Sequence, residues 1–253
     1  MTDFLLGTDA ANEETVRLPA AVLWDMDGTL VDTEPYWIAA EYDLVESHGG
    51  TWADEFAHEL VGNALEVSAR VILDRTGIEL TVPEVVQALL ERVVSRVDEQ
   101  VPWRPGAPQL LAELRALGVP SALVTMSYRS LAEAVVGQLP DESFHSLVTG
   151  DEVARGKPDP EPYLVAARQL GVRPEDCIAI EDSPTGVTSA TAAGVPTIAV
   201  PNVVPVPHIP GAVHVETLAG VSAADLTRLV APATSPQGTA EAPGDLGAPS
   251  SRR

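Results

Sequence analysis

Short apolar runs alternate with longer, helix-like segments along most of the chain. The runs have the length of buried strands and are bounded by turn-forming residues, whereas the segments between them are long enough for helices. The strand-like runs cover residues 21–24, 121–125, 146–149, 177–180 and 197–200, and the helix-like stretches lie near 107–117, 129–138, 160–171 and 184–193. Alternation of this kind requires crossover connections and therefore predicts a parallel α/β sheet.

The pattern changes after the first strand. Three helix-like segments, at 34–49, 65–77 and 83–101, follow one another with no strand-like run between them. We therefore predict an all-helical insertion, with residues 102–108 as the linker that returns the chain to the sheet.

The ends of the chain and one proline-rich stretch complete the predicted organisation. The last 23 residues contain no aromatic residue and one Leu, which predicts disorder. The stretch PNVVPVPHIP at 201–210 holds too many prolines for a central strand and is predicted to be a loop. The predicted parts are a core over 19–33 and 105–231, a helical cap over 34–104, an N-terminal extension over 1–18 and a disordered tail over 232–253.

Two carboxylates directly follow the first predicted strand. Asp25 and Asp27 come after the apolar run AVLW, and Gly28 turns the chain at once. An Asp-Gly turn with two solvated carboxylates would explain them locally. Open parallel sheets, however, carry their binding chemistry at the carboxyl ends of the strands, so a functional role is an equal expectation.

Further polar residues stand at equivalent places on other strands. Thr125 has good strand propensity, and Asp182 or Ser183 suits the N-cap of a helix that begins at Pro184. These local explanations leave out Glu181 and do not explain why the residues converge on one edge of the sheet. The group at the strand ends and in the loop beside them consists of Asp25, Asp27, Thr125, Lys157, Glu181 and Asp182.

The composition limits the partners of such a site. With 37 acidic and 15 basic residues, the chain has a formal net charge of −22 and should repel nucleic acid and anionic membrane surfaces. A phosphate ligand would have to be drawn by a local cation. Lys157 is the only Lys beside 14 Arg, which suggests that a compact ammonium is needed there, although a chance surface lysine is the simpler explanation of this fact alone.

The clustered residues fit a site that binds a divalent cation together with a phosphate. Several carboxylates in one crevice raise one another's pKa values unless a cation lies among them. Ligands that offer only oxygen favour Mg²⁺, which also prefers sites shared with a phosphate. A lone ammonium, a hydroxyl and the amide donors of a turn complement the oxygens of a phosphoryl group. The expected reaction is therefore phosphoryl transfer.

The sequence also predicts where the protein resides. No apolar run approaches the roughly 18 residues of a spanning helix, and the first residues are acidic where a signal peptide would be basic. The single Cys177 excludes an internal disulfide and lies in an apolar run, so we interpret it as a small buried hydrophobic residue. We expect a soluble, cytoplasmic and monomeric protein.

At these residues the sequence resembles the haloacid dehalogenase superfamily, in particular its phosphatases and phosphomutases with a small helical cap. Four motifs occur in the order found in that family and cover roughly residues 20–230. They are DMDGT at 25–29, Thr125 in LVTMS, Lys157 in GKPDP, and EDSPTG at 181–186. The resemblance implies a Rossmann-like core whose helical cap closes over the active site.

The resemblance also implies a role for each motif residue. Asp25 would be the nucleophile that forms an aspartyl phosphate, and Asp27 the general acid for the leaving oxygen and then the base for water. Thr125 and Lys157 would hold the phosphate, and Lys157 would also restrain Asp25. The implied Mg²⁺ ligands are Asp25, the backbone carbonyl of Asp27 and Asp182, with Glu181 in support.

Specificity in this family comes from the cap. The cap candidates here are Glu34, Tyr36, Trp37 and the loop at 60–65. Arg129, just after Thr125, would either meet a second anionic group of the substrate or lie on a helix surface. The predicted substrate contacts are Met26, Gly28, Glu34, Trp37, Thr125, Met126 and Arg129.

The four motifs do not separate a phosphatase from a β-phosphoglucomutase, but the cap does. Those mutases carry a His 12 residues after the nucleophile, where this chain has Trp37, which cannot accept a proton. They also carry an Arg three residues after the Gly of the cap loop, where this chain has the uncharged Leu65. We therefore predict a Mg²⁺-dependent phosphatase that acts on a small phosphorylated metabolite such as a sugar phosphate. A phosphomutase is the alternative, and a non-catalytic binding module on the same fold is the second.

Other enzyme classes leave residues unexplained. A dehalogenase would need neither Asp27 nor the pair at 181 and 182, and an Asp-x-Asp glycosyltransferase would have no use for Lys157. A two-carboxylate glycosidase needs no metal cluster. A nicotinamide-binding domain is disfavoured because no GxGxxG follows the first strand.

Overall fold

The computed structural model describes residues 17–60 and 64–231. In these residues six strands form one parallel sheet with the order β3-β2-β1-β4-β5-β6. The strands are β1 (Ala21–Trp24), β2 (Ser121–Val124), β3 (Ser146–Val148), β4 (Cys177–Glu181), β5 (Thr197–Ala199) and β6 (Ala212–His214). The strand order reverses between β1 and β4, which is where open α/β sheets bind ligands. The predicted parallel α/β sheet is confirmed.

The edge strand β6 has no counterpart in the sequence prediction. It comprises three residues, Ala212–His214, which is too short for an alternating pattern to be visible. Among the strands of the described residues it pairs only with β5, and its last residue, His214, is exposed. The predicted loop at 201–210 connects these two strands and contains no strand or helix.

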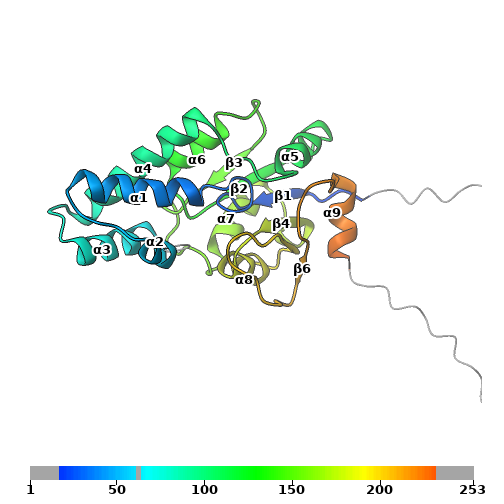
Figure 1. Ribbon diagram of the computed structural model, residues 1–253. Helices are drawn as coiled ribbons and strands as arrows, with labels where there is room; N and C mark the ends of the chain where they lie inside the picture. Colours follow the sequence, from blue (N-terminus) through cyan, green and yellow to red (C-terminus); the bar gives the residue numbers. More distant parts are fainter. Residues whose placement is uncertain (1–16, 61–63, 232–253) are drawn as a thin grey trace, which may run out of the picture.

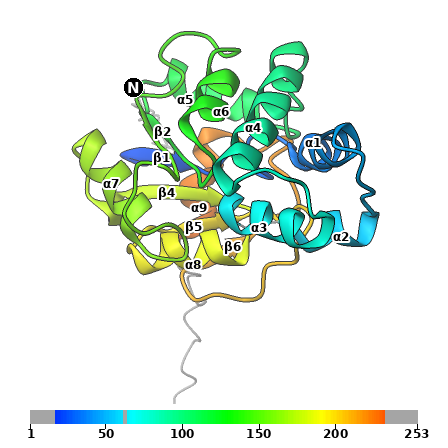
Figure 2. The same cartoon turned by 90° about the vertical axis from the view of Figure 1, so that its left-hand side faces the viewer.

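Helices cover both faces of the sheet. Because side chains alternate along a strand, Ala21 and Leu23 belong to one apolar cluster and Val22 and Trp24 to another. Figure 2 shows α5 and α8 on opposite sides of the strands. The first face packs against α7 (Glu161–Leu170) and α8 (Pro184–Ala192), and the second against α5 (Ala107–Ala116) and α9 (Ala223–Val230). A short 3₁₀ turn, η1 (Pro174–Asp176), leads into β4.

Four helices between β1 and β2 form the cap, which lies at one end of the molecule (Figure 1). They are α1 (Glu34–Ser47), α2 (Asp54–Leu60), α3 (Leu65–Thr76) and α4 (Val82–Glu99). The all-helical insertion is thus confirmed, with one helix more than the pattern predicts, because the seven residues of α2 are too few to show a helical period.

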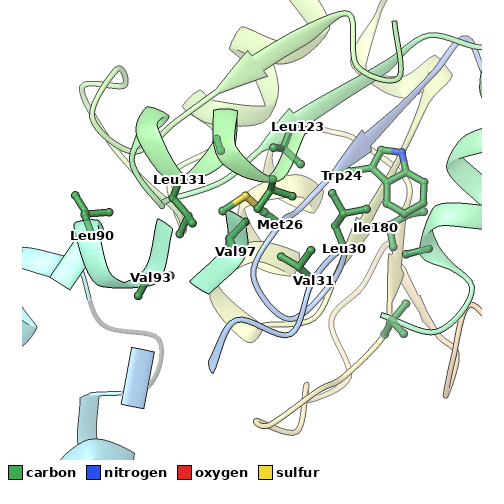
Figure 3. Packing of buried hydrophobic residues seen from close by; sticks show 14 of the residues in the cluster. Trp24, Met26, Leu30, Val31, Leu90, Val93, Val97, Leu123, Leu131 and Ile180 are labelled. Carbon is green, nitrogen blue, oxygen red and sulfur yellow. The ribbon is translucent and has the colours of Figure 1, made fainter. Parts of the chain in front are cut away.

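The longest cap helix, α4, joins the cap to the core. It begins at a capping box in which Thr81 and Glu84 satisfy each other's backbone groups, and its buried residues form an apolar stripe. The stripe packs on α1 and α3 of the cap and on α6 (Arg129–Val136) of the core. Figure 3 shows Val97 of this helix next to Met26, in the turn after β1. The apolar core therefore runs without a break from the sheet into the cap.

Two antiparallel connections link the cap to the core. The backbone N–H of Asp32 donates to the carbonyl of Pro102 at 2.8 Å, and the N–H of Arg104 donates to the carbonyl of Leu30 at 3.0 Å. The predicted return linker is shorter than expected, because α5 already begins at Ala107. We keep 34–104 as the proposed bounds of the cap and 19–33 with 105–231 as those of the core.

Some expectations concern residues that the structure does not describe. The predicted tail at 232–253, most of the N-terminal extension and residues 61–63 of the cap loop lie outside the described residues. Within the described part of the chain, no helix is both long enough and apolar enough to cross a membrane.

Candidate active site

The candidate residues meet where β1, β2 and β4 end. Asp25 directly follows β1, and its backbone N–H donates to the carbonyl of Ile180 at 3.0 Å, which continues the pairing with β4. Thr125 follows β2, and Glu181 is the last residue of β4. All three candidate side chains are buried. The polar groups therefore emerge side by side from an apolar sheet, beside the reversal of strand order.

A tight turn after Asp25 lets another carboxylate approach. The carbonyl of Met26 accepts hydrogen bonds from the backbone N–H groups of Leu30 and Val31. Gly28 has a φ of 89°, and a Cβ atom there would lie 2.0 Å from Oδ2 of Asp182. Only a glycine permits both this backbone conformation and this contact. The structure thus places Gly28 against a predicted metal ligand.

Lys157 is the centre of the buried charges. Its ammonium group donates to Oδ1 of Asp25 at 2.7 Å, to Oε1 of Glu181 at 2.6 Å and to the carbonyl of Val124 at 2.9 Å. Burial alone would lower the pKa of Lys157, but the charges of Asp25 and Glu181 outweigh burial and raise it. All three donors of the ammonium group are used, so the planar guanidinium of an Arg would not fit the same three acceptors.

Glu181 is held by the protein through both oxygens. Oε1 accepts from Lys157 and from the hydroxyl of Tyr163 at 2.8 Å, while Oε2 accepts from the backbone N–H groups of Asp182 and Ser183. Ser183 is the N-cap of α8, because its hydroxyl accepts from the N–H of Gly186 at 3.0 Å. Glu181 therefore fixes the position of Lys157 and the start of α8.

Three carboxylates form a group suited to a divalent cation. One oxygen each of Asp25, Glu181 and Asp182 lies within 4.8 Å of the others. Within the described residues, Oδ2 of Asp25 is buried and has no hydrogen-bond partner. Burial and the charge of Glu181 raise the pKa of Asp25 to about 7, and burial and the charge of Asp25 raise the pKa of Asp182 to about 9. A bound cation would offset this repulsion, and oxygen ligands of this kind suit Mg²⁺.

Asp27 has different surroundings from Asp25. Its Oδ1 accepts a hydrogen bond from the hydroxyl of Thr33 at 2.5 Å. Its Oδ2 accepts from the hydroxyls of Thr125 at 3.2 Å and Ser127 at 2.7 Å. Asp27 thus accepts its hydrogen bonds from hydroxyl groups, whereas Asp25 accepts one from Lys157, and the two neighbouring carboxylates have different environments. Sequence reasoning did not assign Thr33 or Ser127, although both stand within two residues of an assigned position or cap boundary.

The side chains of four other predicted substrate contacts make their main contacts within the protein. The side chain of Met26 is fully buried in the core, so any contact with a substrate would fall to its backbone. The sulfur of Met126 accepts a hydrogen bond from the N–H of Lys157 at 3.2 Å. The guanidinium of Arg129 pairs with Glu152 and Glu133 and also donates to the carbonyl of Leu147. The structure therefore does not bring Arg129 to the buried charges. Trp37 packs, partly buried, against the core cluster.

Glu34 faces a cavity of about 630 Å³ at the cap boundary. Burial raises the pKa of Glu34 to about 7, with a further contribution from the charges of Asp27 and Asp32. Across the same boundary, the hydroxyl of Tyr128 in the core donates to the carboxylate of Glu66 in the cap. Burial and this hydrogen bond raise the pKa of Tyr128 to about 12, so the hydroxyl keeps its proton.

Comparisons with known proteins agree with this arrangement. The family model of haloacid dehalogenase-like hydrolases matches residues 19–194. The chain is 34% identical to hexitol phosphatase A of Escherichia coli, over 70% of this chain and 81% of that protein. It is 37% identical to N-acetylmuramic acid 6-phosphate phosphatase of Pseudomonas aeruginosa, over 71% and 80%. The crystal structure of CbbY from Rhodobacter sphaeroides in complex with phosphate superposes with a TM-score of 0.74 at 29% identity and covers 83% of this chain and all of that one.

Proposed function

From its membership of the haloacid dehalogenase-like hydrolase family, as a phosphoric monoester hydrolase, we propose that the chain hydrolyses a small phosphorylated metabolite such as a sugar phosphate. The proposed reaction uses Mg²⁺ and passes through an aspartyl phosphate on Asp25. The observation that carries the proposal is the asymmetry of Asp25. One oxygen of this carboxylate is tied to Lys157, and the other is buried without a hydrogen-bond partner in the described structure. A restrained carboxylate with one available oxygen is what a nucleophile requires.

The proposed reaction consists of two displacements. In the first, Oδ2 of Asp25 attacks phosphorus, the bond from phosphorus to the ester oxygen breaks, and Asp27 gives its proton to the leaving oxygen. In the second, Asp27 takes a proton from a water molecule, which attacks phosphorus and releases inorganic phosphate and the Asp25 carboxylate. The separate surroundings of the two carboxylates support this division of roles, because one group must stay ionised while the other exchanges a proton.

Asp25, Asp182 and the backbone carbonyl of Asp27 would hold the cation. When bound, the cation would reduce the repulsion between the Asp25 carboxylate and the anionic ester. The hydroxyl of Thr125 would donate to a phosphoryl oxygen by turning its single proton away from Asp27, to which it donates at 3.2 Å in this structure. Lys157 would act mainly by holding Asp25, since its three protons are already donated to protein oxygens.

Two cap residues, Trp37 and Leu65, favour hydrolysis over mutase activity. A mutase must protect its phosphoenzyme from water and hold a second phosphate, and Trp37 and Leu65 offer neither an acid-base group nor a charge for those tasks. Incubation with β-glucose 1-phosphate and a trace of the 1,6-bisphosphate tests this choice. We expect free phosphate, whereas rapid formation of glucose 6-phosphate without phosphate release would favour the mutase. A monomeric, cytoplasmic enzyme remains a prediction from the sequence.

Hydrolysis of an aryl phosphate tests the mechanism. We expect turnover with Mg²⁺, loss of turnover in chelator, and no turnover in Asp25→Asn, which removes the nucleophile and keeps the shape. Asp74→Asn, at an exposed position of α3, is the matched control and should behave as the wild type. Mg²⁺ should raise the melting temperature of the wild type more than that of Asp182→Asn. Near wild-type turnover in Asp25→Asn would exclude the covalent mechanism.

A further inference from the structure

The cavity at the cap boundary lies outside the group of residues that handles the phosphate. Its volume of about 630 Å³ falls in the range of small-molecule sites. Its walls come from both parts of the protein, since His58 belongs to the cap helix α2 and Val203 to the core loop after β5. Ile38 of α1 adds to an apolar side of the cavity. A space between cap and core with one apolar wall can take the carbon skeleton of a substrate.

The cavity is connected to the proposed general acid by a short piece of chain. Asp32 and Glu34 line the cavity, and Thr33 between them donates its hydroxyl hydrogen bond to Asp27. The side-chain amide of Asn202 donates to Oδ1 of Asp32 at 3.2 Å and so fixes that wall. Glu34 also lies near enough to Asp27 for the two carboxylates to interact electrostatically. The cavity is therefore the neighbouring space in which a group that leaves the phosphorus atom beside Asp27 could be received.

The polar wall of the cavity is acidic. Of its three carboxylates, Asp43 is paired with Arg96 at 2.8 Å and Asp32 accepts the hydrogen bond from Asn202. Glu34 has neither a hydrogen bond nor an ion pair with any described residue. The one opposing influence on its charge comes from His58, which also lines the cavity, and among the described residues no Lys or Arg lines the cavity to receive an anion.

On the basis of the proposed function, we propose that this cavity receives the leaving group of the ester, and that Glu34 excludes leaving groups with a second negative charge. The substrate class is then the monophosphates of neutral or cationic polyols, and bisphosphates and phosphorylated acids are rejected. Hydroxyl groups can donate hydrogen bonds to Glu34, whereas a carboxylate or second phosphate is repelled by it. Two like charges separated by about 5–10 Å near a protein surface change binding by roughly tenfold or more.

A matched pair of substrates isolates this charge effect. Glucitol 6-phosphate and 6-phosphogluconate share a six-carbon chain and differ at the end opposite the phosphate, where one has a hydroxymethyl group and the other a carboxylate. The ratio of their kcat/KM values, measured with Mg²⁺ at pH 8, reports discrimination within one protein, so a loss of folded enzyme cancels. We expect the wild type to prefer the neutral ester by at least about tenfold.

Two variants assign the effect to Glu34. Glu34→Gln should reduce the preference severalfold, mainly by improving kcat/KM for 6-phosphogluconate. Glu46→Gln, at an exposed position of the same helix that does not line the cavity, should leave the ratio unchanged. Equal hydrolysis of both esters by the wild type, or an undiminished preference in Glu34→Gln, would overturn the inference while leaving the phosphatase intact. Absence of phosphate release from every ester, the aryl phosphate included, would overturn the proposed function and this inference with it.

Discussion

Replacing Lys157 with Met should both destabilise the protein and stop catalysis. Met has a similar length and no charge, so the substitution removes three hydrogen bonds and leaves two carboxylates without their cation. The Lys157 side chain is 5% exposed, and its partners Asp25 and Glu181 are 9% and 0% exposed. Water therefore cannot replace the lost partner.

The structure sets the scale of the effect. Removing one member of a buried, hydrogen-bonded ion pair costs about 3–5 kcal/mol, because the remaining charge is left unpaired. For a protein of this size, that corresponds to a fall in melting temperature of roughly 10 °C. Lys157→Arg should also be destabilised, since a planar guanidinium cannot reach three oxygens that surround a compact ammonium.

Chemical denaturation in the absence of added metal measures this cost directly. Arg70→Met, at an exposed position of α3, is the control for replacing a cation with Met and should change the free energy of unfolding by no more than about 0.5 kcal/mol. Phosphate release by folded Lys157→Met should fall at least about a hundredfold, because Asp25 is no longer held. A free energy of unfolding within 1 kcal/mol of the wild type would refute the argument that Lys157 neutralises buried charge.

Three further predictions concern the surroundings of the site. Burial raises the pKa of Glu41 from 4.5 to about 8, so the folded protein retains a proton that the unfolded chain loses, and stability should fall as the pH rises through this window. Relative to Glu41→Gln, the free energy of unfolding of the wild type should therefore fall by about 4 kcal/mol between pH 5 and pH 9 in denaturation experiments, and parallel pH profiles would contradict the assignment. Tyr128→Phe removes the hydrogen bond to Glu66 between core and cap, and should raise KM roughly fivefold with little change in melting temperature; an unchanged KM would show that this contact does not favour cap closure. Ser127→Ala removes one of the hydroxyls that hold Asp27, and should lower kcat about tenfold at constant melting temperature, a result that full activity would exclude.

The sheet could be predicted because its strands are buried on both faces. Every position of β1, β2 and β4 is buried, and apart from Ser121 at the start of β2 and Glu181 at the end of β4 the three runs are apolar, which makes them visible in the sequence. The helix α9 is not among the predictions, although Ser222 and Asp225 form a capping box that would have indicated its start. It lies after a proline-rich loop, where the alternation of strands and helices is no longer regular.

The candidate site could be predicted only in part. The sequence marks residues at strand ends, because parallel strands bring those ends together, and the structure places Asp25 and Lys157 in contact. It does not mark Ser127, which meets a carboxylate 100 positions away, or Tyr163, which resembles any buried aromatic residue of a helix. These contacts depend on side-chain directions that no local pattern encodes.

Glu181 shows why a carboxylate at a strand end needs its contacts before it can be given a role. By residue type and position it is equivalent to Asp182 as a metal ligand, yet its oxygens accept five hydrogen bonds from the protein. Asp25 keeps one oxygen without a partner in the described structure. The contacts of Glu181 therefore orient Lys157, and in the proposed reaction the available oxygen of Asp25 is the one left for the cation or the phosphorus atom. In a chain with a net charge of −22, a single buried Lys can hold Asp25, the proposed nucleophile, only because a second carboxylate, itself fully satisfied, holds that Lys in turn.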